Sequence, residues 1–155
     1  MKIRNIEKSD RQQWNPLWQA YLVFYETSLP DQTTDLTWDR FFDSSHVFTG
    51  FVAEEDGKLL GGGGIYPTEG LPAKTCELVK MYLHKDARGK GLGKQMIEQC
   101  LTWAKDNGYE QVYLESMPEL SKAVSIYEKV GFEKLNQALG NSGHCGCDIW
   151  MLKKL

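Results

Sequence analysis

The pattern of apolar and polar positions along this chain predicts a protein in which helices and strands are mixed. Near the N-terminus, apolar residues recur at i, i+3, i+4, i+7, i+8 and i+11, which is the spacing of one helix face. These residues are Trp14, Leu17, Trp18, Tyr21, Leu22 and Tyr25. Pro16 could restart or kink this helix, and Ser9 with Gln12 fits a capping box. We interpret the aromatic stripe as core packing, with Phe24 and Tyr25 as an alternative wall of a substrate pocket.

The remaining elements follow from the same kind of pattern. Strands are predicted at residues 2–6, 46–54, 58–66, 77–83, 111–115 and 147–152, with a short strand after Gly131-Phe132. Further helices are predicted at residues 37–43, 91–107 and 119–129, and residues 28–37 are expected to form a polar loop. The resulting order is β-α-α-β-β-β-α-β-α-β-β. We therefore expect a mixed α/β sheet in a single domain over residues 1–155, with a mostly antiparallel front half.

A run of glycines marks the second strand of a predicted hairpin. The two strands are joined by Asp56-Gly57, which is a strong two-residue turn signal. The run consists of Gly61, Gly62, Gly63 and Gly64. Glycine inside a strand indicates a bulge, or a place where a ligand or another backbone comes close; a loose strand end is the alternative. We therefore regard Gly63 and Gly64 as candidate substrate-binding residues.

Composition restricts the partners of the protein. A formal net charge of −3 argues against a nucleic-acid or anionic-membrane surface, because such a surface needs a basic excess. The longest apolar runs fall short of the ~20 residues of a membrane span, and the N-terminus lacks the apolar core of a signal peptide. We therefore expect a cytoplasmic protein with reduced cysteines.

The cysteines fall into two groups. Cys76 and Cys100 lie within apolar patterns and are interpreted as small core residues. Cys145 and Cys147, beside His144, could bind a metal, but they lack the second ligand cluster that zinc sites normally have. A tight entry into the last strand is the better interpretation, so no metal site is predicted.

The most informative stretch covers residues 77–94, ELVKMYLHKDARGKGLGK. A largely apolar strand leads into a glycine-rich turn, and Leu92 opens a helix. The backbone N–H groups of such a turn, backed by the positive end of the helix dipole, form an anion site. Glycine is needed because a Cβ would keep phosphates away from the backbone. The stretch therefore predicts a phosphorylated cofactor.

Spacing excludes two common nucleotide-binding motifs. The nucleoside-triphosphate loop needs G-x-x-x-x-G-K followed by Ser or Thr, but glutamine follows Gly93-Lys94 here. The dinucleotide fingerprint G-x-G-x-x-G also fails, because Gly89 and Gly91 are followed by lysine at the last position. The pattern that remains is R-x-x-G-x-G, which begins at Arg88.

This pattern, in its strand–turn–helix context, resembles the coenzyme A signature of the GCN5-related N-acetyltransferases. A second motif, AVSIYEKVGF at residues 123–132, is similar to the family's A-x-x-x-Y-x-K-x-G-F ending. The resemblance is continuous over residues 77–132 and extends more loosely over the whole chain. One departure is Leu120, where many relatives carry Asn. The resemblance implies the family's fold, a central and mostly antiparallel sheet with splayed fourth and fifth strands and flanking helices.

The resemblance also implies that acetyl-CoA is the cofactor. The backbone N–H groups that would bind its pyrophosphate are those of Arg88, Gly89, Lys90, Gly91, Leu92, Gly93 and Lys94. The strand residues Met81, Tyr82 and Leu83 would align the pantetheine arm and the thioester. Tyr127 and Lys129 of the second motif would complete the cofactor site.

Catalytic roles follow from the same resemblance. The Leu83 N–H would stabilise the oxyanion on the thioester carbonyl. Tyr127 would protonate the departing thiolate, its alternative role being packing on the apolar face of its helix. Glu77 lies where histone-acetylating relatives carry a catalytic glutamate, and a buried carboxylate with a raised pKa suits a general base. A structural ion pair, for example with Lys80, is the alternative for Glu77, and Glu115 is the rival base.

The function implied is an N-acetyltransferase that moves the acetyl group of acetyl-CoA to a primary amine by direct attack in a ternary complex. We expect a small or amino-acid-like acceptor, framed by the first helix, the loop at residues 31–35 and the glycine strand. A protein N-terminus or lysine is the alternative acceptor, and a non-catalytic acyl-CoA sensor is the alternative function. A homodimer is compatible with the family.

Overall fold

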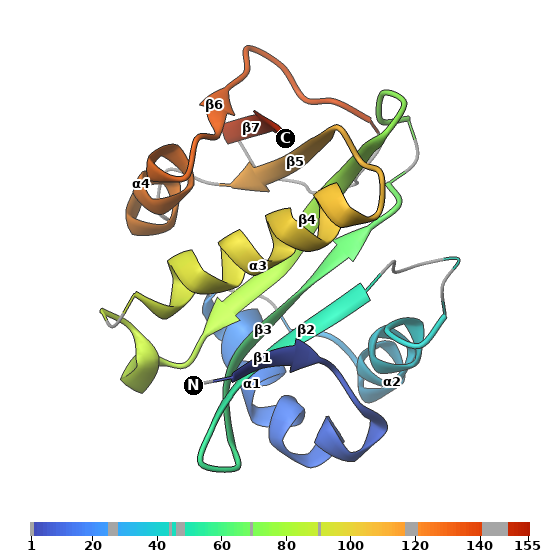
Figure 1. The fold of residues 1–155 in the computed structure, drawn as a ribbon. Helices are drawn as coiled ribbons and strands as arrows, with labels where there is room; N and C mark the ends of the chain where they lie inside the picture. Colours follow the sequence, from blue (N-terminus) through green and yellow to red (C-terminus); the bar gives the residue numbers. More distant parts are fainter. Residues whose placement is uncertain are drawn as a thin grey trace. The chain divides into compact units, whose positions relative to one another are not determined.

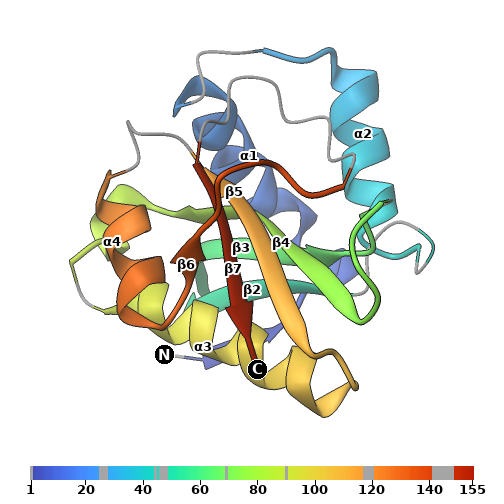
Figure 2. The same ribbon diagram turned by 90° about the horizontal axis from the view of Figure 1, so that it is seen from above.

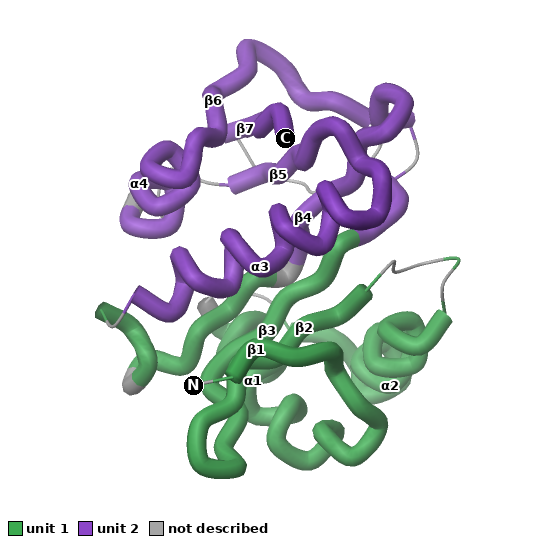
Figure 3. Tube along the Cα trace, viewed as in Figure 1, with its two compact units in different colours: residues 1–65, 80–90 green, residues 66–79, 91–155 purple. Residues whose placement is uncertain are grey.

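The computed structural model describes residues 2–24, 28–43, 45, 49–68, 70–89, 91–116, 121–140 and 149–155. The chain forms two compact units, Met1–Ile65 with Lys80–Lys90, and Tyr66–Val79 with Gly91–Leu155 (Figure 3). In the described residues the order of elements is the predicted one, apart from short 3-10 helices at Lys8–Asp10 and Lys85–Ala87 (Figure 1). None of the helices in these residues has the length and apolar character needed to cross a bilayer.

The first unit is built on a run of neighbouring strands. These are β1 (Lys2–Asn5), β2 (Thr49–Glu55), β3 (Lys58–Tyr66) and the C-terminal part of β4 (Thr75–Leu83), in that order. β1 and β2 are antiparallel, as are β2 and β3. Asp56 and Gly57 join β2 to β3 with φ of 51° and 79°, the positive values that a type I′ hairpin turn requires. The predicted hairpin is confirmed.

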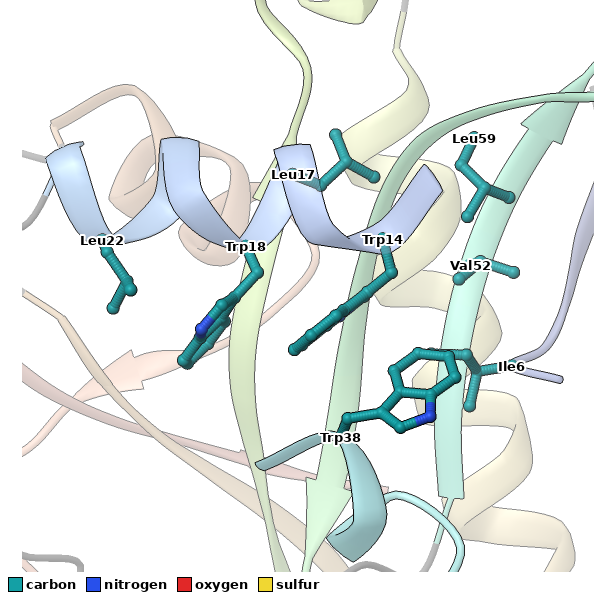
Figure 4. Close-up of a cluster of buried hydrophobic side chains, with 8 residues drawn as sticks. All are labelled: Ile6, Trp14, Leu17, Trp18, Leu22, Trp38, Val52 and Leu59. Carbon is teal, nitrogen blue, oxygen red and sulfur yellow. The ribbon is translucent and has the colours of Figure 1, made fainter. Parts of the chain in front are cut away.

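Two helices, α1 (Arg11–Phe24) and α2 (Asp31–Arg40), supply the aromatic core of this unit. The rings of Trp14 and Trp18 stack with centroids 5.4 Å apart, and Trp38 of α2 lies 5.1 Å from Trp14. Figure 4 shows the three indoles gathered between α1 and the part of α2 that carries Trp38. The buried cluster comprises Ile6, Trp14, Leu17, Trp18, Leu22, Trp38, Val52 and Leu59. The buried members of the stripe, from Trp14 to Leu22, are therefore core packing, as the sequence predicted, whereas Tyr25 lies outside the described residues.

The start of α2 differs from the prediction. The helix begins at Asp31, inside the segment expected to be a polar loop, after Pro30 in an extended conformation (φ −58°, ψ 152°). The polar Thr34 and Thr37 are nevertheless buried. Thr34 is satisfied because its Oγ1 accepts a hydrogen bond from the indole N–H of Trp18 at 3.1 Å. The polar composition of this segment indicated a loop. Burial of Thr34 was not expected because Trp18, which satisfies its hydroxyl, is distant in sequence.

The start of α1 also differs from the prediction. The capping box lies two residues earlier than predicted: it joins Glu7, the N-cap of the 3-10 helix, to Asp10, rather than Ser9 to Gln12. The Asp10 carboxylate accepts a hydrogen bond from the Glu7 N–H at 2.8 Å. Pro16 lies inside a continuous helix and neither restarts nor ends it. A single proline near the start of a helix removes only one backbone hydrogen bond, which the buried aromatic face offsets.

The glycine run marks both a bulge and a close backbone approach. The register between β2 and β3 shifts between Ala53, opposite Gly61, and the next residue. A Cβ built on Gly61 would collide with the carbonyl oxygen of Tyr82, and one on Gly63 would lie 2.5 Å from Met81 Sδ. Glycine is needed at Gly61 because the backbone of β4 lies so close to β3, whereas the Met81 side chain opposite Gly63 can shift.

The second unit continues from the N-terminal part of β4. Its strands follow in the order β4, β5 (Gln111–Ser116), β7 (Ile149–Lys154) and β6 (Glu133–Lys134). β4 and β5 are parallel, with Thr75 opposite Gln111 and Glu77 opposite Tyr113, whereas β7 is antiparallel to both β5 and β6 (Figure 2). The helices α3 (Leu92–Asp106) and α4 (Ser121–Lys129) belong to the same unit.

The core of the second unit contains the apolar face of α3. Its buried residues are the ones that periodicity predicts: Leu92, Met96, Ile97, Cys100, Leu101 and Ala104. Cys76 of β4 and Cys100 are both fully buried. Burial raises the pKa of the Cys76 thiol to about 12, and it raises that of Cys100 as well. The prediction that these two cysteines are core residues is confirmed.

Candidate active site

The glycine-rich turn has the backbone conformation expected of an anion site. Gly89 and Gly91 have φ of 80° and 76°, in the left-handed region that favours glycine. Gly91 is the N-cap of α3 and has no side chain that could cap the first N–H groups of the helix, which are the groups that bind anions at helix N-termini. A Cβ at either glycine would meet no protein atom within 4 Å. Positive φ, rather than crowding by the protein, therefore explains both glycines; Lys90 lies outside the described residues.

Arg88, the first residue of the motif, connects the turn to the end of β4. Its Nε donates a hydrogen bond to the carbonyl oxygen of Leu83 at 3.3 Å. Its guanidinium also lies 5.6 Å from the ring centroid of Tyr82, which makes a cation–π contact. Met81, Tyr82 and Leu83 are half-buried at the end of this strand. The side chain of Arg88 therefore braces the segment that the sequence assigns to thioester alignment.

The second motif lies on α4 and the turn after it. The half-buried ring of Tyr127 meets Phe132 edge-on, with centroids 5.8 Å apart, and its carbonyl oxygen accepts the Phe132 N–H at 3.0 Å. Lys129 is exposed in the last turn of α4, and Lys94 is exposed in the first turn of α3. The packing of Tyr127 onto Phe132 fixes its ring and is compatible with either of the roles considered for it.

Glu77 is enclosed in the second unit. It is 1% exposed, and the Thr68 hydroxyl donates a very short hydrogen bond to its Oε1. Its partner across the parallel pair is Tyr113. A neutral hydroxyl thus contacts this carboxyl. The side chain of Lys80, the ion-pair partner considered from the sequence, lies outside the described side chains.

Glu115, the rival base, is held by a tyrosine. The Tyr113 hydroxyl donates to Glu115 Oε2 at 2.7 Å and accepts the backbone N–H of Leu139 at 3.0 Å. The pKa of Tyr113 is raised, first by burial and then by its hydrogen bond to Glu115, with further contributions from the charges of Glu115 and Glu77. The hydroxyl therefore keeps its proton and acts as a donor.

These carboxylates lie on one face of the β4–β5 pair. Side chains alternate along a strand, so Tyr113 and Glu115 share a face, and parallel register puts Glu77 beside Tyr113 on it. Two residues earlier on each strand, on the same face, Gln111 Nε2 donates a hydrogen bond to Thr75 Oγ1 at 2.7 Å. Thr68 and Tyr113 contact the candidate carboxylates and are candidate site residues that the sequence did not suggest. The two-residue spacing of Tyr113 and Glu115 was the available signal for the second.

The predicted acceptor site is only partly described. A pocket in the first unit is lined by Ile6, Trp14, Leu17, Trp18, Tyr21, Phe41, Phe51, Gly61, Gly62, Gly63 and Tyr82. It includes Gly63 but not Gly64, and it lies along α1 from Trp14 to Tyr21. Tyr25 and the Phe24 side chain fall outside what the structure describes, as do His144, Cys145 and Cys147. Residues 31–35, expected as a framing loop, belong to α2 and do not line this pocket.

Comparison with known proteins finds similar sequences among acetyltransferases. Residues 14–132 match the model of the acetyltransferase (GNAT) family. The chain is 36% identical to the uncharacterized N-acetyltransferase YjgM of Escherichia coli, over 83% of this chain and 75% of that protein. It is 27% identical to the D-amino-acid N-acetyltransferase HPA3 of Saccharomyces cerevisiae, over 84% of each.

Solved structures share the fold. A phosphinothricin acetyltransferase from Sinorhizobium meliloti, in complex with acetyl-CoA, superimposes with a TM-score of 0.79 at 18% identity, over 99% of this chain and 88% of that one. This cofactor is the one that the sequence predicts. The family, the fold and the enzyme class predicted from the sequence are confirmed. The chain belongs to the acetyltransferase (GNAT) family.

Proposed function

We propose that this protein transfers the acetyl group of acetyl-CoA to the primary amine of a small or amino-acid-like acceptor, by direct attack in a ternary complex. The observation that carries the proposal is the left-handed glycine turn that caps α3 directly after β4. The donated N–H groups of such a turn suit a pyrophosphate. The similarity to an enzyme named for D-amino acids supports an amino-acid-like acceptor.

The turn and the end of β4 are proposed to bind different parts of the cofactor. The N–H groups of the turn hold the pyrophosphate, and Met81 to Leu83 align the pantetheine arm through their backbone. The Leu83 N–H stabilises the oxyanion as the amine nitrogen attacks the thioester carbon. Arg88 supports this geometry through its hydrogen bond to the Leu83 carbonyl.

Proton transfer is assigned to Glu115 or Glu77 and to Tyr127. The attacking amine loses a proton to Glu115 or, through water, to the enclosed Glu77. The C–N bond forms as the C–S bond breaks, and Tyr127 protonates the departing thiolate. The partial exposure of Glu115, against 1% for Glu77, favours Glu115 for direct contact with an acceptor.

The apolar part of the acceptor is proposed to lie against the half-buried rings of Tyr21, Phe41 and Tyr82, which line a pocket of the first unit. Its lining consists of apolar and aromatic residues with bare glycine backbone, and none of them is charged. Tyr82 belongs both to this lining and to the segment assigned to thioester alignment. Neutral, compact apolar groups suit such walls.

A cytoplasmic location and a homodimer stay predictions.

The test is an acetyl-CoA assay that reads free thiol over a panel of small amines, amino acids and peptides. We expect thiol release with small amines or amino acids, and acetyl-CoA binding by calorimetry without any amine. Tyr127→Phe should lower turnover while leaving acetyl-CoA affinity near normal. Release with peptides alone would favour a protein acceptor. Binding without release across the panel would indicate a sensor and contradict the proposal.

A further inference from the structure

We propose that Tyr113 is a positioning residue, which holds Glu115 in the orientation in which this carboxylate takes the proton of the acceptor amine. The inference rests on the proposed acetyltransferase function. It chooses Glu115 over Glu77 as the base and gives the buried tyrosine between them a role in the reaction.

The Tyr113 hydroxyl is a fixed point in the second unit. The residue is fully buried, so its ring has little freedom to move. Its oxygen makes two hydrogen bonds, one donated to Glu115 Oε2 at 2.7 Å and one accepted from the Leu139 N–H at 3.0 Å. Because burial of the ring and the Leu139 N–H fix the position of the Tyr113 hydroxyl, this hydroxyl restricts the orientation of the Glu115 carboxylate that it contacts.

The two carboxylate oxygens of Glu115 differ in their surroundings. Oε2 is engaged by Tyr113, and among the described residues Oε1 has no hydrogen-bond partner. The side chain is only partly buried. Glu77, in contrast, is 1% exposed and receives the Thr68 hydroxyl on its Oε1. Within the described part of the chain, an acceptor would displace no partner of Glu115 Oε1, whereas the enclosed Glu77 would need a relay.

The chemistry suits this division. A hydroxyl that donates to one carboxylate oxygen fixes the orientation of the group and leaves the other oxygen to accept a proton. Tyr113 remains a donor because burial and the neighbouring carboxylates raise its pKa. The ammonium of the acceptor transfers a proton to Oε1 of Glu115, and the neutral amine then attacks the thioester. The second proton that the nitrogen loses on forming the amide replaces the one that Tyr127 gives to the departing thiolate.

The first test is Tyr113→Phe in the full chain, assayed with the best acceptor from the amine panel. The change removes one oxygen and leaves the ring in place. We expect kcat to fall roughly 10-fold, a part of the 10²–10⁴ that a general base typically supplies. The dissociation constant of acetyl-CoA should stay unchanged. Full activity would overturn the role of Tyr113.

The second test is a double-mutant cycle with Glu115→Gln. If Tyr113 acts through Glu115, adding Tyr113→Phe to Glu115→Gln should cause no further loss of kcat. An independent further loss would show a merely structural role and overturn the inference. The matched control is Gln111→Leu, which breaks the 2.7 Å hydrogen bond to Thr75 on the same strand pair and should leave kcat unchanged.

Two further outcomes separate the hypotheses. Should Tyr113→Phe fail to fold, Glu115→Asp retracts the carboxylate from the Tyr113 hydroxyl by one methylene group. It should lower kcat in the same way, and full activity would overturn the inference. Absence of thiol release by the unaltered protein would overturn the proposed function and this role together. An active protein with a fully active Tyr113→Phe variant would overturn the role of Tyr113 alone.

Discussion

At Gly91 the backbone takes a left-handed conformation, with φ of 76°, immediately before the first turn of α3. A side chain there would strain the backbone even though the surrounding space is open. The same combination occurs at Gly108, which has φ of 85° and follows the C-cap of α3. The two glycines thus have equal conformational demands, but only Gly91 belongs to the proposed phosphate turn.

This pair gives a matched test of the cofactor site. We expect Gly91→Ala to weaken acetyl-CoA binding roughly 10-fold, or about 1.4 kcal/mol, because the turn loses its conformation and gains a Cβ beside the phosphates. Gly108→Ala carries similar strain and should leave acetyl-CoA affinity unchanged. Calorimetric titration of both variants measures this difference. Equal losses of affinity would show that strain in α3, rather than contact with the cofactor, governs binding.

Among the elements, β1 and β2 are joined to the start of α1 by one arginine. The Arg4 guanidinium donates to both carboxylate oxygens of Asp10 at 2.8 Å and to Glu54 of β2 at 2.7 Å. Asp10 is 5% exposed. The hydrogen bond from Arg4 is the main cause that holds the pKa of Asp10 below its ordinary value of 3.8. The folded form therefore releases this proton at lower pH than the unfolded chain does.

A pH-dependent loss of stability follows from this difference. The contribution of Asp10 is fully present above pH 3.8 and declines as the pH falls through the lower pKa of the folded state. Asp10→Asn should lower the free energy of unfolding by about 1–3 kcal/mol at pH 7. The difference from the unaltered protein should shrink at pH 3, as urea unfolding at both pH values would show. Asp35→Asn, at a 61% exposed side chain, should change stability little at either pH.

Local patterns predicted most elements because their signals lie within a few residues. The turn at Asp56-Gly57 and the buried face of α3 are of this kind. The start of α2 was missed because Thr34 is satisfied by Trp18, sixteen residues away. Tyr113 and Leu139, which are in contact, are 26 residues apart in sequence, and no local sequence pattern predicts this contact. Family motifs located the cofactor turn, whereas the surroundings of the two glutamates needed coordinates.

At the scale of the whole molecule, the buried cysteines report on global opening. Cys76 and Cys100 are both fully buried, with raised pKa values, so the thiolate form that reacts is scarce. In a variant with Cys145→Ser and Cys147→Ser, these two thiols should react with a thiol reagent at least about 100-fold more slowly in native buffer than in denaturant. Rapid labelling in native buffer would contradict the described core.

The route of the chain between the two units has a further consequence. The first unit is made from Met1–Ile65 and Lys80–Lys90, and the second from Tyr66–Val79 and Gly91–Leu155. Each unit is therefore discontinuous in sequence, and β4 supplies residues to both. Shortening the gene from either end cannot yield one intact unit on its own. Proteolytic nicking or library truncation of this protein should give all-or-none survival rather than a stable half.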